Sequence, residues 1–261
     1  MNDPNGLVYL DGEYHLFYQF NPTASVWGQI GWGHAVSRDL MNWQELPEAL
    51  PSDERGMAFS GSAVIDLENT SGLSDGQTPA MVAIYTCHSL INDAPLQTQH
   101  LAWSIDRGRS WQRYDGNPVL DIGSGSFRDP KVFWHTASSQ WIMAVVLASE
   151  CQVQFYGSPN LLAWSYLSDF GPCGNMEGEW ECPDLFPLTL GDGSNRRKWI
   201  LKVDNTLSGV AGGSGGQYFV GEFDGTRFIS DSASNQAIDD GMPIDYGSDF
   251  YAAMTWSNLP A

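Results

Sequence analysis

The chain has 261 residues, of which 42% are hydrophobic and 13% aromatic, so it can form one large all-β domain or two smaller ones. Its formal net charge is −19, with only 12 lysines and arginines. Nucleic acids and anionic membranes are bound through basic patches, so this composition argues against both as partners. A neutral or cationic substrate fits the charge better. No apolar stretch reaches the roughly 18 residues of a membrane-spanning helix, and no signal peptide is visible.

The first six residues, MNDPNG, place an acid among turn-forming residues, just before the apolar run at 7–10. The proline disfavours a helical conformation at Asp3, and Asn-Gly is a strong hairpin signal. One interpretation is a polar turn. The other is a carboxylate held at the start of a strand, where it can take part in chemistry. The segments further along the chain favour the second.

One short element recurs: a small polar residue at the end of a strand, a tight polar turn, and a closing aromatic. An apolar or aromatic strand precedes each copy, and no stretch longer than about ten residues has a convincing helical period. Repeated four-stranded units are typical of a β-propeller, whereas a β-sandwich would require the similar turns to be a coincidence. The copies are SRDLMNW at 37–43, SIDRGRSW at 104–111, SPNLLAW at 158–164 and the weaker EFDGTRF at 222–228.

The repeat divides a single propeller domain, 1–261, into consecutive units. After the fourth unit, the run DFYAAMTW looks like the first strand of a fifth. A propeller has to close, because an open ring leaves an unpaired edge. The chain is therefore either a four-bladed ring with a tail or a five-bladed ring with its last blade incomplete. The expected blades are 1–50, 51–118, 119–172 and 173–235, with the start of a fifth at 245–261.

Acidic residues stand where these units begin. In a propeller the first strand of each blade lines the central channel, so the starts of these strands surround one mouth. Asp3, Asp129 and Glu181 occupy three such positions. Glycoside hydrolysis needs two carboxylates, one to attack the anomeric carbon or activate water and one to protonate the leaving oxygen. The alternatives are an ordinary ion pair between Arg128 and Asp129, and a Glu181 that is simply one acid among neighbouring glutamates.

Three of these segments together resemble the enzymes of glycoside hydrolase family 32, which include invertases, exo-inulinases and levanases. The segments are MNDPNG at 1–6, FRDP at 127–130 and WECP at 180–183. Each is short, but their combination, order and spacing are specific. Supporting stretches are YHLFYQFNP at 14–22, WGHAVSRDLMNW at 32–43, FSGSAV at 59–64 and QYFVGEFDG at 217–225. The resemblance therefore covers essentially the whole chain.

The resemblance implies an all-β, five-bladed β-propeller and a retaining β-fructofuranosidase that acts on sucrose or fructans such as inulin and levan. Asp3 would be the nucleophile that forms a covalent fructosyl-enzyme intermediate. Glu181 would be the general acid and then the general base. Asp129 would stabilise the positively charged transition state through the fructose hydroxyls. The partner would be a fructose-containing oligosaccharide or polysaccharide, and the chemistry requires no cofactor and no metal.

Substrate contacts follow from the same matching stretches. Trp27 and Phe59 either form an apolar wall for fructose or belong to the core. Arg128 could pair with Asp129 or with Glu181 and tune both. The expected substrate-binding residues are Asn2, Gln19, Trp27, Phe59, Ser60, Arg128 and Asp245.

The chain departs from the family pattern at both ends. Family members begin a few tens of residues before MNDPNG, and they continue through a complete fifth blade into a C-terminal β-sandwich. We therefore expect this chain to be part of a longer protein, with the last blade incomplete and no β-sandwich, and we expect the parent protein to be secreted or extracellular. A fructosyltransferase that uses the same intermediate is an alternative. So is a truncated, inactive propeller that binds sugars. The oligomeric state stays open.

The cysteines form no CxxC pair, and no histidine spacing indicates zinc. They are either free and buried or joined in up to two disulfides. The four are Cys87, Cys151, Cys173 and Cys182.

Overall fold

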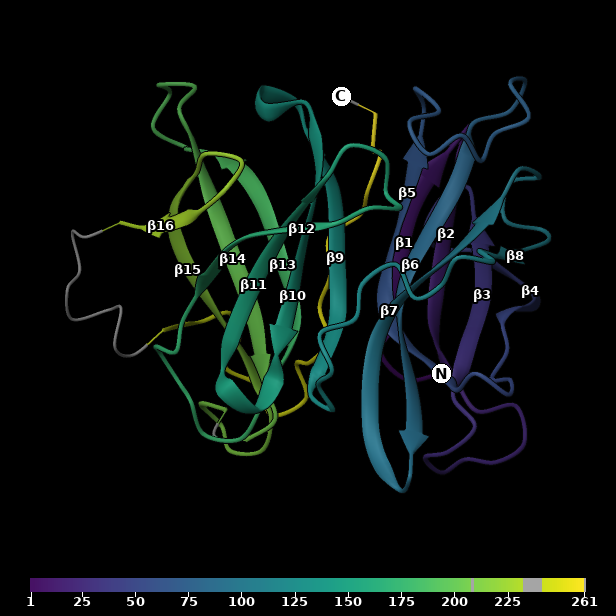
Figure 1. Cartoon of the computed structure of the whole chain (residues 1–261). Coiled ribbons are helices and arrows are strands. Elements are labelled where there is room, and N and C mark those ends of the chain that lie inside the picture. The colour runs from purple at the N-terminus through teal and green to yellow at the C-terminus, as the bar shows by residue number, and fades with distance from the viewer. Residues whose placement is uncertain (208, 232–240, 261) are drawn as a thin grey trace.

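The computed structural model describes residues 1–207, 209–231 and 241–260 (Figure 1). Their regular structure is β, apart from two short 3-10 turns, η1 (Thr136–Ser138) and η2 (Ala148–Glu150). Within these ranges no helix is long and apolar enough to cross a membrane.

Four antiparallel sheets follow one another along the chain, and in each sheet the strands lie in sequence order. Blade 1 contains β1 (Pro4–Leu10), β2 (Glu13–Phe20), β3 (Gly31–Ser37) and β4 (Trp43–Leu50). Blade 2 contains β5 (Met57–Asp66), β6 (Ala80–Ile91), β7 (Ala94–Ser104) and β8 (Gln112–Arg113). Blade 3 contains β9 (Phe127–His135), β10 (Gln140–Leu147), β11 (Gln152–Ser158) and β12 (Ser165–Phe170). Blade 4 contains β13 (Trp180–Thr189), β14 (Arg197–Asn205), β15 (Gly215–Phe223) and β16 (Phe228–Ser230), and β17 (Met242–Pro243) pairs with β15.

The sheets are arranged as a propeller, with blades 1 and 2 on the right of Figure 1 and blades 3 and 4 on the left. The first strand of each blade is innermost: β1 contacts β5, β5 contacts β9, and β9 contacts β13. Three apolar clusters fill the spaces between successive blades. Both faces of a middle strand are therefore covered, which is why β10 is buried along almost its whole length. These interfaces confirm the propeller and not the sandwich.

The repeated sequence element is a repeated turn between the third and fourth strands of a blade. In the first three copies the closing tryptophan donates its indole N–H to the carbonyl three residues earlier, at 3.1 Å for Trp43, 3.0 Å for Trp111 and 2.9 Å for Trp164. The turn's Asp or Asn accepts backbone N–H groups, which fixes the turn locally. The fourth copy keeps this arrangement at Asp224, but its closing Phe228 has no N–H to donate. The sequence repeat thus reflects a repeated hydrogen-bond pattern.

The prediction of a fifth blade is not confirmed. No strand forms between 245 and 260, and residue 261 lies outside the described residues. Instead, the yellow C-terminal segment rises between the two pairs of blades (Figure 1). Ser257 exchanges two backbone hydrogen bonds with β1, donating to the Leu7 carbonyl at 2.9 Å and accepting from the Tyr9 N–H at 3.0 Å. A single segment with one neighbouring strand does not make a blade, because a stable sheet needs several paired strands.

No disulfide joins any of the four cysteines, so of the two alternatives that the sequence left open the thiol form is the one present. Three of them are buried. Burial raises the pKa of Cys87 to about 11 and raises that of Cys151 as well. The thiolate is the reactive form of cysteine, so these residues are inert packing groups.

Two buried histidines face each other inside blade 1. His15 on β2 and His34 on β3 are joined by a 3.1 Å hydrogen bond between Nδ1 of the first and Nε2 of the second. Burial lowers the pKa of His15 to about 4 and that of His34 to about 3, although Glu13, 3.6 Å from His15, opposes the shift at His15. Both imidazoles are therefore neutral at pH 7.

We expect this pair to make the fold sensitive to acid. Below about pH 6.5 the unfolded chain binds protons that the folded chain excludes, so stability falls as the pH drops toward the folded pKa values. The loss between pH 7 and pH 5 is up to about 2 kcal/mol per histidine. Thermal melts at pH 5, 6 and 7 should show a smaller pH dependence in a His15→Gln/His34→Gln variant than in the wild type. Equal pH slopes in the two proteins would contradict this assignment.

Candidate active site

The innermost strands are irregular near the same end of the channel. The pairing register shifts in β1 between Asn5 and Val8, in β5 between Ala58 and Gly61, and in β13 beyond Glu181. The ladder of β9 shifts in the same way next to Asp129. Bulges of this kind bend a strand and redirect its side chains. They therefore turn residues at the strand starts toward the channel mouth.

Two of these irregularities hold non-glycine residues in a left-handed backbone conformation. Asp129 has a φ of 62° and Cys182 a φ of 47°. Such conformations are uncommon and concentrate at functional sites. Here they fall within FRDP and WECP, the two segments that carry candidate catalytic residues.

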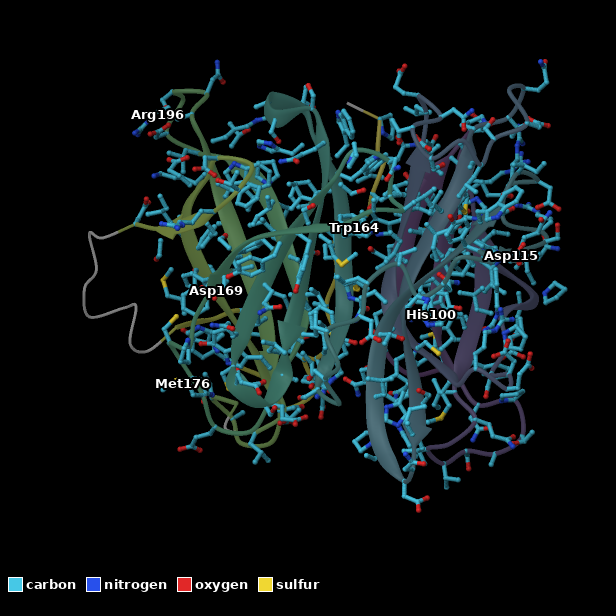
Figure 2. The ribbon with its side chains drawn as sticks, viewed as in Figure 1. His100, Asp115, Trp164, Asp169, Met176 and Arg196 are labelled. Atoms are coloured by element: carbon cyan, nitrogen blue, oxygen red, sulfur yellow. The ribbon has the colours of Figure 1, made fainter. Side chains whose placement is uncertain are left out.

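The mouth lies at the end of the propeller that is lower in the figures. Blade 4 shows this directly, because Met176 in the loop leading into β13 and Arg196 in the turn after it mark opposite ends of the blade (Figure 2). Asp3, Asp129 and Glu181 belong to the Met176 end, since they stand at the starts of β1, β9 and β13. The three residues predicted to be catalytic therefore come from three blades to one mouth.

Burial and neighbouring charges change the ionisation of the two aspartates of this group. Burial raises the pKa of Asp3, and the negative charge of Glu181 raises it further. Burial likewise raises the pKa of Asp129, with smaller contributions of the same sign from Glu181 and Asp3. Close, partly desolvated carboxylates are a recognised arrangement for separating acid and base roles.

Asp129 is fixed on both sides. Its side chain is only 6% exposed, and its Oδ2 accepts the Cys182 N–H at 3.0 Å. Its own backbone N–H donates to the Thr86 hydroxyl at 3.0 Å. The hydrogen bond from Cys182 joins blade 3 to blade 4 next to Glu181, so the positions of Asp129 and Glu181 are coupled.

Glu181 is held at both oxygens. Arg128 donates from Nε at 3.0 Å and from Nη2 at 2.8 Å to Oε1, and it also pairs with Glu179. Tyr251 hydrogen-bonds to Oε2. Of the two partners expected for Arg128, its direct hydrogen bonds go to Glu181. This orients the carboxylate toward the mouth.

Tyr251 was not among the predicted site residues. Burial raises its pKa, and the adjacent Glu181 carboxylate raises it further, so the phenol stays protonated and can donate. It lies within DFYAA, the stretch expected to begin a fifth blade, and nothing in that short stretch indicates a contact with Glu181. The residue comes to Glu181 only because the segment runs through the channel.

Asp3 is tied to the neighbouring strand. The Asn2 N–H donates to the Gln19 carbonyl and the Gln19 N–H donates to the Asp3 carbonyl, both at 3.0 Å. The side-chain amide of Gln19 in turn donates to the Ala58 carbonyl at 3.2 Å. The first residues of the chain are therefore pinned between blades 1 and 2. Asn2 is exposed, whereas Gln19 is buried.

An aromatic group lies beside this arrangement. Trp27 is 70% exposed and packs edge-on against Phe59, with ring centroids 6.4 Å apart. The ring of His88 stacks parallel on Phe59, with ring centroids 4.7 Å apart, and no sequence motif indicated this contact. Trp27 is thus not a core residue, while Ser60 next to Phe59 is buried.

Asp245 does not join the three carboxylates. It is exposed and accepts the Gly247 N–H at 2.6 Å. It lines a separate cavity of about 340 Å³ with Asn175, Asn205 and Gln217. A larger cavity of about 640 Å³ is lined by the far ends of β5, β9 and β13, and none of the three carboxylates borders it. In the ranges described, no group of three His, Cys, Asp or Glu side chains could hold a metal.

Comparison with known proteins agrees with this geometry. Residues 1–260 match the model of the glycosyl hydrolases family 32 N-terminal domain. The chain belongs to this family. It is 49% identical over 263 residues to a levanase of Bacillus subtilis and 43% identical over 285 residues to an extracellular exo-inulinase of Aspergillus niger. These alignments cover 100% and 99% of the chain, but only 37% and 53% of the relatives.

Solved structures of family 32 proteins have the same fold. The crystal structure of exo-inulinase from Aspergillus awamori superposes with a TM-score of 0.93 at 40% identity, covering 100% of this chain and 55% of that one. The fructofuranosidase of Schwanniomyces occidentalis complexed with fructose gives a TM-score of 0.91 at 41% identity, covering 100% and 50%. The chain thus spans about half the length of these family members.

Proposed function

We propose that this domain carries the catalytic residues of a retaining β-fructofuranosidase that releases terminal fructose from sucrose or from fructans such as inulin and levan. The observation that carries the proposal is the convergence of Asp3, Asp129 and Glu181 from three blades on one mouth, with both oxygens of Glu181 engaged. The names of the relatives, levanase, exo-inulinase and fructofuranosidase, support the substrate class.

In the first step the Asp3 carboxylate attacks the anomeric carbon while the bond from that carbon to the leaving oxygen breaks. Glu181 donates its proton to the leaving oxygen. In the second step water attacks the same carbon, Glu181 accepts a proton from the water, and the Asp3 carboxylate is released. Asp129 faces the positive charge that develops on the sugar and stabilises it.

The substrate side of the site consists of aromatic and polar groups. Trp27 and Phe59 offer an apolar wall to the sugar, and Arg128 positions Glu181. The roles of Asn2, Gln19, Ser60 and Asp245 in substrate binding remain part of this proposal, with Asp245 the most distant from the other groups. We also propose that the parent protein is secreted, because several relatives are named extracellular exo-inulinases.

The test is product analysis with sucrose, inulin and levan as separate substrates. We expect free fructose from at least one of them. NMR taken before mutarotation should show the β-anomer first, because two displacements at the anomeric carbon retain its configuration. The α-anomer would contradict the retaining mechanism. Longer fructosides in place of free fructose would support a fructosyltransferase, and a folded protein that releases nothing would support an inactive sugar-binding propeller.

A further inference from the structure

We infer that Lys202 is a positioning residue of the candidate active site, fastening the strand that carries Glu181 to the segment that carries Tyr251. The inference rests on the proposed function of these residues. Lys202 lies on β14, which pairs with β13 in blade 4, and its ammonium group contacts the C-terminal segment at Ala253.

The contacts of Lys202 reach three parts of the chain. Its side chain is only 3% exposed. The ammonium group donates to the Cys182 carbonyl at 3.2 Å and to the Ala253 carbonyl at 2.7 Å, and it pairs with the Asp204 carboxylate. An ammonium group has three donors, so all three are used.

Two of these contacts lie next to groups that touch the candidate catalytic residues. Cys182 follows Glu181 in sequence, and its N–H binds Asp129. Ala253 lies two residues after Tyr251, whose hydroxyl binds Glu181. Lys202 therefore holds the residue whose N–H binds Asp129, and it holds the chain two residues away from the tyrosine that binds Glu181. Displacements of about 1 Å in such groups can lower a rate by about 10²-fold.

The positive charge of Lys202 also acts on the proposed nucleophile, Asp3. Asp3 is influenced by Glu181, which raises its pKa, and by Lys202, which lowers it. Further charged groups near the mouth include Asp129, Asp204 beside Lys202, and Arg128 with its partner Glu179. Loss of the ammonium should therefore leave Asp3 protonated up to a higher pH.

A second buried pair offers a comparison within the same molecule. Lys131 on β9 donates to the Thr255 carbonyl at 3.0 Å and to its hydroxyl at 2.9 Å, and it lies 3.3 Å from Asp184. Asp184 accepts the Thr255 N–H at 2.6 Å. This pair fastens the same segment but binds it two residues further from Tyr251. A variant of the Lys131–Asp184 pair therefore tests anchoring of the segment alone, without the effect that Lys202 has on the pKa of Asp3.

A buried ion pair is weak evidence for stability, since a neutral replacement of similar shape is often tolerated. The experiment therefore removes both charges together, in a Lys202→Met/Asp204→Asn variant. Lys198→Met is the matched control, because Lys198 lies on the same strand and forms surface ion pairs with Glu222 and Asp231. The comparison variant is Lys131→Met/Asp184→Asn.

We expect Lys202→Met/Asp204→Asn to fold cooperatively, to lose about tenfold in kcat on sucrose or inulin with little change in KM, and to shift the acidic limb of its pH profile to higher pH. Lys198→Met should behave as the wild type. Lys131→Met/Asp184→Asn should leave the acidic limb of the pH profile where it is in the wild type. A folded Lys202 variant with the wild-type kcat and pH profile would overturn the inference.

A measurement without turnover keeps this test separate from the proposed function. Carbon-13 NMR of labelled aspartate carboxyls, with Asp3→Asn to assign the signal, follows the titration of Asp3 directly. We expect the Asp3 midpoint to rise in the Lys202 variant and to stay unchanged in Lys198→Met. An unchanged midpoint would overturn the charge effect even if the wild type released no fructose. Lack of fructose release by the wild type would contradict only the proposed function.

Discussion

Replacing Asp3 by Ala is expected to lower kcat/KM for fructose release by about 10³-fold or more, because the covalent intermediate cannot form without the carboxylate. Asp3 precedes β1 at the channel mouth, where the Gln19 N–H holds its carbonyl. The fold should be unaffected, because the backbone hydrogen bonds that tie residues 2 and 3 to β2 do not involve this side chain. The measurement is initial-rate release of fructose, together with a thermal melt.

Two controls make the Asp3 experiment specific. Asp11→Ala removes an exposed acid from the turn after β1, where it pairs with Arg107, and should retain full activity. Azide added to Asp3→Ala should restore turnover by attacking the anomeric carbon directly, with a product of inverted configuration. Fructose release by Asp3→Ala without azide, at a rate near that of the wild type, would rule out Asp3 as the nucleophile.

Replacing Glu181 by Gln is expected to lower kcat for sucrose and inulin by about 10²–10⁴-fold, the usual contribution of general acid–base catalysis. The amide preserves the shape of the side chain but cannot donate the proton that the leaving oxygen needs. β-Fructofuranosyl fluoride tests this directly, because fluoride leaves without a proton. The substitution should impair the first step of fluoride hydrolysis far less than the first step of sucrose hydrolysis.

The second half-reaction supplies an independent readout for Glu181. Water attack requires a base, so Glu181→Gln should accumulate the intermediate on Asp3, and azide should release it as a fructosyl azide of retained configuration. Glu222→Gln, at an exposed position on β15, is the matched control. Equal losses in the rate of the first step on the fluoride and on sucrose would contradict the role of Glu181 as the acid.

The geometry explains why Arg128 should not be treated as a simple substrate ligand. It is buried, and its guanidinium binds the same oxygen of Glu181 twice while also pairing with Glu179. Tyr251 holds the other oxygen. The carboxylate therefore keeps one orientation through both proposed steps, which is the preorganisation that positioned acid–base groups need.

Local features of the sequence were enough to identify the blades. The turns closed by Trp43, Trp111 and Trp164 depend on hydrogen bonds within a few residues, so a recurring sequence element indicates a recurring structure. The spacing of MNDPNG, FRDP and WECP likewise indicated that carboxylates occur at the starts of inner strands. Such signals are readable because they depend on neighbours along the chain.

The number of blades and the partners within the site were decided by contacts between distant segments. The stretch at 251–258 has the composition of a strand, but Lys131, Lys202 and β1 hold it as a single extended segment in the channel. Its composition could not reveal that Tyr251 reaches Glu181 from 70 residues away. The choice of Glu181 as the direct partner of Arg128 also required the packing of blade 3 against blade 4.

The sequence by itself thus determined the all-β propeller class and the position of each blade turn, because local hydrogen bonding and strand periodicity encode them. The three acidic residues were indicated by their positions at strand starts and by the resemblance to family 32, and their catalytic roles are part of the proposed function. Only the tertiary structure decided which side chains surround those acids, how burial and neighbouring charges shift the pKa values of Asp3 and Asp129, and where the C-terminal segment runs. The physical reason is that desolvation and long-range pairing depend on segments that meet only after the blades have packed around the channel.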